Sequence, residues 1–216
     1  MILEKYKSIV FDCDGVVLNS NKVKTSAFYQ AALPYGEDAA SSLVLYHIRN
    51  GGVSRYKKFA HFLENIVKPG CKGPNIDSLL KAYSDQVWQG LLNCEIAEGL
   101  ESLRAKTQHA NWLIASGGDQ EELRRLFIQR DIFRYFDGGV FGSPDSKQDI
   151  LFRELSAGNI SSRAVLIGDS RYDYQAASEL ALDFIFCSGW SEVEDPSSWL
   201  PKNARVITAV KDILTY

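Results

Sequence analysis

Residues 8–20 of the 216-residue chain read SIVFDCDGVVLNS, an apolar run that ends abruptly in two acids. The run 9–11 is typical of a buried strand, and Asp12 and Asp14 follow it directly. Because unpaired charge is expensive in a protein interior, carboxylates at the end of a buried strand require a partner that offsets them. The identity of that partner decides what the protein does.

Other short apolar runs, each ending in a polar or Gly-rich turn, recur in the second half of the chain. They are typical of strands buried on both faces, as parallel strands are. Helical patterns separate them, and strand–helix alternation predicts a Rossmann-like parallel α/β sheet. The expected strands are residues 112–115, 139–141, 164–167, 184–187 and a short one near 206–207; the expected helices are 119–130, 147–156, 171–180 and 208–214.

Residues 19–96 interrupt this alternation with helical patterns and no buried strand. Glycine- and proline-containing breakers separate those patterns. We therefore expect an α/β core of residues 1–18 and 97–216 and an inserted α-helical domain of residues 19–96. Its helices are expected over residues 23–33, 41–48, 54–67 and 76–92.

Composition limits the classes of partner. The formal net charge is −3, with 45% hydrophobic and 24% charged residues, which argues against a nucleic-acid or membrane-surface partner. The N-terminus lacks the apolar segment of a signal peptide, and no apolar run approaches 18 residues, so a cytoplasmic location is expected. The cysteines show no metal-binding spacing and are expected to be reduced packing residues; they are Cys13, Cys71, Cys94 and Cys187.

Polar side chains follow several expected strands at the same end. In open parallel sheets, ligands bind beyond the carboxyl ends of the strands. Alone, each acid there is a typical turn or cap residue, but their coincidence at one edge favours a functional site. These residues are Asp12, Asp14, Ser116, Lys147, Asp169 and Asp173.

The residue types at this edge suit phosphate chemistry. Carboxylates at short range repel unless a cation lies among them, and oxygen ligands of this kind suit Mg²⁺, which in turn attracts phosphate. One carboxylate can attack phosphorus, and a second can protonate the leaving oxygen and later activate water. Ser116 and the N–H groups of Gly117 and Gly118 can hold phosphoryl oxygens beside a helix that starts near Asp119. Lys147 offers a fixed cation.

The ordered set resembles the haloacid dehalogenase superfamily on its phosphatase side. The four motifs appear as DCDGV at 12–16, Ser116 in LIASGG, Lys147 in GSPDSK and GDSRYD at 168–173. The helical insertion after the first motif resembles the cap of the subgroup that includes phosphoglycolate phosphatase and β-phosphoglucomutase. Hinges of such a cap are expected near 18–21 and 96–100.

The resemblance implies a role for each motif residue. Asp14 favours phosphate esters, because dehalogenases and phosphonatases of this superfamily lack an acid at its position. The implied roles are nucleophile and Mg²⁺ ligand for Asp12, general acid/base and backbone-carbonyl ligand for Asp14, phosphoryl binding for Ser116 with Gly117 and for Lys147, second carboxylate ligand for Asp169, and support for Asp173.

The cap offers weaker candidates. Arg55, in GGVSR with Ser54 as an expected N-cap, resembles a substrate-contacting segment of the mutase cap; a solvated charge is the alternative. Lys24 is a second candidate substrate contact, with a surface helix lysine as its alternative. Lys57 and Lys58 are expected to be solvated, and His47 is expected on a helix face.

The favoured function is a Mg²⁺-dependent phosphatase that hydrolyses a small phosphorylated metabolite, such as a sugar phosphate, through an aspartyl-phosphate on Asp12. A phosphomutase of the β-phosphoglucomutase type is the alternative, and Asn19 and Lys24 depart from its pattern. A non-catalytic binding module is disfavoured, because the acids and Lys147 are all present. The sequence identifies neither the substrate nor the oligomeric state.

Overall fold

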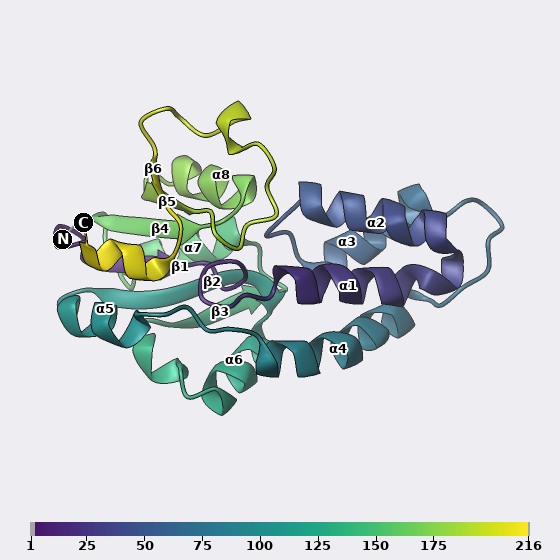
Figure 1. Cartoon of the computed structure of the whole chain (residues 1–216), viewed down its shortest axis with the longest axis horizontal. Helices are drawn as coiled ribbons and strands as arrows, with labels where there is room; N and C mark the ends of the chain where they lie inside the picture. The colour runs from purple at the N-terminus through teal and green to yellow at the C-terminus, as the bar shows by residue number, and fades with distance from the viewer. Residues whose placement is uncertain (1–2, 216) are drawn as a thin grey trace.

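The protein is built on one parallel sheet. The structure, a computed structural model, describes residues 3–215; residues 1, 2 and 216, at the ends of the predicted core, lie outside that range. Every paired strand is parallel, in the order β3-β2-β1-β4-β5-β6 (Figure 1), so the predicted α/β class is confirmed. The strands are β1 (Ser8–Phe11), β2 (Asn111–Asp119), β3 (Gly139–Ser143), β4 (Ala164–Gly168), β5 (Asp183–Cys187) and β6 (Arg205–Ile207).

Helices cover both faces of the sheet. Alternate side chains of each strand point to opposite faces, so each strand contributes to a buried cluster on either side. Val10 belongs to a buried cluster with Ile150 and Ala176, whereas Phe11 belongs to a second cluster with Leu126. The strands are therefore apolar at consecutive positions, which is the pattern that predicted them. The helices around the sheet are α5 (Leu100–Lys106), α6 (Gln120–Gln129), α7 (Lys147–Ser156), α8 (Arg171–Glu179) and the 3₁₀ helix η5 (Val210–Thr215).

A bundle of helices follows β1 and lies beyond one end of the sheet, on the opposite side from the described chain ends (Figure 1). Its interior is aromatic: the Phe28 ring centroid lies 4.5 Å from that of Tyr83 and 5.1 Å from that of Phe59. None of the described helices is both long and apolar enough to cross a bilayer. The bundle contains α1 (Asn21–Ala32), α2 (Glu37–Arg49), α3 (Arg55–His61), the π-helical turn η2 (Phe62–Ile66) and α4 (Ile76–Asn93). We call it the helical insertion; its predicted bounds as a separate domain, 19–96, stay a prediction.

The structure corrects three expected elements and adds one helix that was not expected. The helix expected over 54–67 ends at His61, and the chain continues as a π turn in which Val67 N–H donates to Phe62 O, 2.9 Å apart. Strand β2 does not end at residue 115, because after a register irregularity it pairs again with β3. The C-terminal helix is 3₁₀. Helix α5 was missed because seven residues, about two turns, are too short to show a repeated apolar pattern.

Candidate active site

The acids that follow β1 and β4 converge with Lys147 at the carboxyl edge of the sheet. Asp12, Asp169 and Asp173 are buried, and each offers a carboxylate oxygen within 4.8 Å of the others. Lys147, the first residue of α7, places Nζ 2.9 Å from Asp12 Oδ1 and also donates to Asp173. Residues far apart in the sequence thus form one buried charge cluster, because parallel strands end at one edge.

The cluster holds three carboxyl groups and one lysine, so negative charge is in excess when the acids are ionised. Burial raises the pKa of Asp12 to about 7, with Lys147 opposing that rise and Asp173 and Asp14 adding to it. Burial also raises the pKa of Asp169, and repulsion from Asp12 and Asp173 adds to it. A divalent cation would offset this repulsion, and an all-oxygen donor set suits Mg²⁺. The residues present therefore fit the metal that the sequence predicts.

Gly15 allows the Asp169 carboxylate to lie close to the loop that follows β1. Its φ is +77°, and a Cβ there would lie 2.0 Å from Asp169 Oδ2. Glycine alone tolerates this backbone without strain and leaves room for the carboxylate. Asn21, at the start of α1, then holds the same oxygen by donating to Asp169 Oδ2 at 2.7 Å, and it also donates to Trp190 O at 2.9 Å.

Asp173 serves as a structural link within the cluster. Its Oδ2 accepts from Ser170 N at 3.0 Å and from Ser170 Oγ at 2.6 Å, which completes a capping box at the start of α8. Its other oxygen accepts from Lys147. Both oxygens are thus engaged by protein donors, which accords with the supporting role expected for Asp173.

Asp14 lies beside the cluster and forms its own ion pair. Its Oδ2 lies 2.5 Å from Lys24 Nζ, and its Oδ1 accepts from Ser20 Oγ at 2.5 Å. Burial acts to raise the pKa of Asp14, but the Lys24 ammonium and the hydrogen bonds from Lys24 and Ser20 lower it below its usual value. Lys24 is therefore a pocket residue in contact with an acid, rather than an exposed helix lysine.

Strand β2 brings the expected phosphoryl-binding group to the same edge, at the position where its regular pairing with β3 is interrupted. Ser116 is buried, and its Oγ accepts from Gly118 N at 3.0 Å. A Cβ at Gly117 would lie 2.0 Å from Gly52 O, so this glycine lets the loop of the helical insertion reach the sheet. Phosphate binding by Ser116 and Gly117 stays a prediction.

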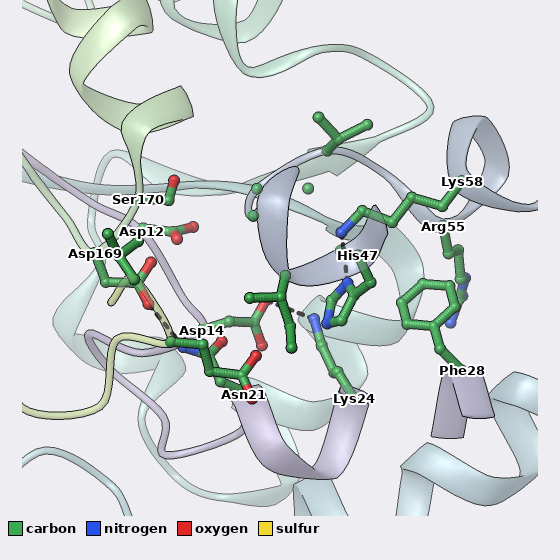
Figure 2. A pocket seen from close by; sticks show the side chains of 18 of the residues that line it. Asp12, Asp14, Asn21, Lys24, Phe28, His47, Arg55, Lys58, Asp169 and Ser170 are labelled. Carbon is green, nitrogen blue, oxygen red and sulfur yellow. Dashed lines mark hydrogen bonds and ion pairs between the residues drawn. The ribbon is translucent and has the colours of Figure 1, made fainter. Parts of the chain in front are cut away.

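A cavity lies between this edge and the helical insertion. It is lined by residues of both the sheet edge and the helical insertion. Asp12 and Asp169 lie on one side of it, and Arg55, Lys58 and His47 lie across it (Figure 2).

Arg55 lines the cavity but is paired with acids of the sheet-covering helix α6. Its Nη1 lies 3.0 Å from Glu122 Oε2, and its Nη2 lies 3.9 Å from Asp119 Oδ2. Asp119 also caps α6 by accepting from Glu122 N at 2.9 Å, at the helix start that the sequence predicted. The charge of Arg55 is thus offset within the protein before any substrate binds.

The expectation that Lys58 is solvated is wrong. Lys58 is 2% exposed, and its Nζ lies 2.6 Å from Nδ1 of the buried His47. The packing of α3 causes this burial. Helix α3 packs with α1 and α4 around Phe59, and Lys58, three residues after the buried Arg55, lies on the same face of α3. That spacing was the signal that sequence reasoning missed. Lys57 is exposed, as expected.

Comparisons with known proteins show the family and the fold. The model of the haloacid dehalogenase-like hydrolases matches residues 6–180. A phosphorylated carbohydrates phosphatase from Thermotoga maritima is 23% identical over 96% of this chain and all of its own length. Among solved structures, CbbY from Rhodobacter sphaeroides in complex with phosphate has a TM-score of 0.72 at 18% identity, covering 96% of both chains. A haloacid dehalogenase-like family protein from Streptococcus pneumoniae has a TM-score of 0.71 at 19% identity, covering 98% of both.

Proposed function

The chain belongs to the haloacid dehalogenase-like hydrolases, and from that premise we propose that it is a Mg²⁺-dependent phosphatase of small phosphorylated metabolites. The family predicted from the four sequence motifs is confirmed. The observation that carries the proposed reaction is the convergence of Asp12, Lys147 and Asp169 at the sheet edge, with Asp14 facing the same cavity.

In this proposal Asp12 attacks phosphorus and forms an aspartyl-phosphate. Asp14 lies two residues on and faces the same cavity. Because Lys24 favours its ionised form in the free protein, Asp14 takes up a proton as the substrate binds and delivers that proton to the leaving oxygen. It then accepts a proton from the water that hydrolyses the intermediate. Lys147 contacts Asp12 and offsets charge on the transferring group. Ser116 binds a phosphoryl oxygen.

Asp12, Asp169 and the Asp14 carbonyl would hold the magnesium ion. When bound, the ion supplies positive charge to the phosphoryl oxygens and offsets the repulsion among the acids. The raised pKa values of Asp12 and Asp169 support this assignment, because burial and repulsion between the acids disfavour their charged forms and a cation would offset both effects.

Two relatives support phosphorylated carbohydrates as the substrate class. The Thermotoga maritima relative is described as a phosphatase of phosphorylated carbohydrates. A CbbY variant from Rhodobacter sphaeroides, 18% identical to this chain, was solved with xylulose 1,5-bisphosphate.

The test is release of inorganic phosphate from a panel of sugar phosphates and from 4-nitrophenyl phosphate, with and without Mg²⁺. We expect Mg²⁺-dependent release by the natural protein, and a loss of at least about a thousandfold in Asp12→Asn, because an amide is a poor nucleophile. Asp145→Asn, at a half-exposed acid, is the matched control. Formation of isomers without phosphate release would instead identify a phosphomutase, and no release from any ester would overturn the proposal.

A further inference from the structure

Three cationic side chains of the helical insertion line the cavity, and acids of the protein neutralise two of them. Lys24 pairs with Asp14. Arg55 pairs with Glu122. Each cation therefore has a counter-charge before any ligand enters, and neither needs one from a substrate.

Lys58 is the exception. Among residues 3–215, no carboxylate oxygen lies within 4.0 Å of its Nζ. Its neighbours are His47 and the ring of Phe28, whose centroid is 5.4 Å from Nζ. A buried ammonium without a counter-ion is costly. Burial and the nearby Lys24 ammonium accordingly lower the pKa of Lys58 to about 7, although the Asp14, Glu192 and Asp12 carboxylates act to raise it from beyond ion-pair distance.

His47 lies beside Lys58 and lines the same cavity. Burial and repulsion from Lys58 and Lys24 lower its pKa well below the usual value, so the imidazole is neutral. When Lys58 is charged it can only donate, so Nδ1 of His47 accepts from it and the proton of the ring is on Nε2. The pair thus presents an ammonium and an N–H donor, and both groups recognise oxygen acceptors.

Building on the proposed phosphatase function, we propose that Lys58 and His47 form a subsite for a second anionic group of the substrate, a carboxylate or a phosphate remote from the transferred phosphoryl group. Figure 2 shows the two side chains across the cavity from Asp12 and Asp169. A bound anion would supply the counter-charge that Lys58 lacks in the protein. Neutral hydroxyl groups would leave that charge uncompensated.

Matched pairs of esters test this subsite, because each pair differs only in the second group. We will compare 3-phosphoglycerate with glycerol 3-phosphate, which exchanges a carboxylate for a hydroxymethyl group, and fructose 1,6-bisphosphate with fructose 1-phosphate, which exchanges a phosphate for a hydroxyl. The natural protein should prefer the doubly anionic member of at least one pair by about tenfold or more in kcat/KM, as a charge-assisted contact implies. The pair that shows the preference distinguishes a carboxylate from a phosphate.

Substitution of Lys58 should remove that preference. Lys58→Met keeps the size of the side chain and should lower kcat/KM for the doubly anionic ester about tenfold more than for 4-nitrophenyl phosphate, chiefly through KM. Lys58→Arg should retain the preference, and Lys57→Met, at the exposed neighbour, is the matched control. Equal turnover of both members of both pairs by the natural protein, or an unchanged preference in Lys58→Met, would overturn the inference.

A binding measurement separates this inference from the proposed function. If the natural protein hydrolyses 4-nitrophenyl phosphate but shows no anion preference, the subsite fails and the phosphatase stands. If no ester is hydrolysed, calorimetric titration of the natural protein and of Lys58→Met with 3-phosphoglycerate and fructose 1,6-bisphosphate decides whether the subsite exists. Binding that weakens about tenfold in Lys58→Met supports the subsite, and equal binding by both proteins rejects it.

Discussion

The Arg55 guanidinium donates to the Glu122 carboxylate across the boundary between the helical insertion and the sheet, with 3.0 Å between Nη1 and Oε2. Both side chains are mostly buried. The next residue of α3 adds a parallel contact, because Tyr56 OH donates to Asp119 Oδ2 at 2.8 Å. One end of α3 is thus tied to the start of α6, beside the expected phosphoryl-binding Ser116.

This pair predicts that Glu122→Gln raises KM for every ester, because a buried guanidinium that loses its main counter-charge holds the helical insertion less firmly over the cavity. We expect about a tenfold rise, equal for 4-nitrophenyl phosphate and for larger substrates. Steady-state kinetics on both classes measure it. Glu121→Gln, at the exposed neighbour, is the control.

Arg55→Met distinguishes a tie between the two parts of the protein from a direct substrate contact. If Arg55 acts only through Glu122, the double variant should be no worse than either single variant. A loss in Arg55→Met that far exceeds that of Glu122→Gln, and that spares 4-nitrophenyl phosphate, would instead show that Arg55 binds substrate.

The role of Asp14 predicts a dependence on the leaving group. Asp14→Asn cannot donate the proton, so turnover of alkyl phosphates should fall about 10²–10⁴-fold, whereas 4-nitrophenyl phosphate, whose leaving group needs little protonation, should lose much less. Rates for a series of esters that differ in leaving-group pKa measure the dependence. Equal losses across the series would show that Asp14 is not the acid.

Asp169 and Asp173 should respond differently to Mg²⁺, although both lie in the same cluster. Mg²⁺ at a hundredfold excess over Kd should stabilise the natural protein by about 2.7 kcal/mol, and Asp169→Asn should lose this gain. Asp173→Asn should be less stable even without Mg²⁺, because Lys147 and the α8 cap lose their carboxylate. Thermal unfolding with and without Mg²⁺ measures both effects. A similar starting stability for the two variants would contradict the separate roles.

The residues that sequence analysis placed in one site share a local signal. Asp12 and Asp169 stand directly after a buried strand, Lys147 follows β3 within four residues, and Ser116 stands where the regular pairing of β2 is interrupted. A parallel sheet brings such positions together whatever the lengths between them. The strands were predictable for the same reason, since each is apolar at consecutive positions. These residues could therefore be assigned to one site without knowing how the helices pack on the sheet.

The cavity side of the helical insertion lacked such a signal. Which face of α3 is buried depends on how α1 and α4 pack against it, and the adjacent Lys57 and Lys58 look alike in the sequence. Only the three-residue spacing from Arg55 to Lys58 indicated a shared face. Asn21 and Glu122 were similarly hidden, because their partners, Asp169 and Arg55, are distant in sequence.

The burial of Lys58 predicts a pH dependence of stability. Its pKa is 10.5 in the unfolded chain and about 7 in the folded protein. Below about pH 7 both states hold the proton, and the cost of burying the charge is fully present. Between about pH 7 and 10.5 the unfolded chain holds the proton while the folded protein releases it, so the free energy of unfolding rises with pH. Lys58→Met lacks this titration and should be the more stable protein at pH 6.

The predicted advantage of Lys58→Met should therefore shrink as the pH rises from 6 to 9. Urea unfolding of both proteins at pH 6, 7.5 and 9 measures the difference, from which the titrations of groups other than Lys58 and its neighbour His47 cancel. Lys57→Met is the control, and its difference from the natural protein should stay constant over this range because Lys57 is exposed. A constant difference for Lys58→Met as well would show that the folded protein keeps Lys58 charged. Its counter-charge would then have to come from the protein itself, and the need for a second anion on the substrate would disappear.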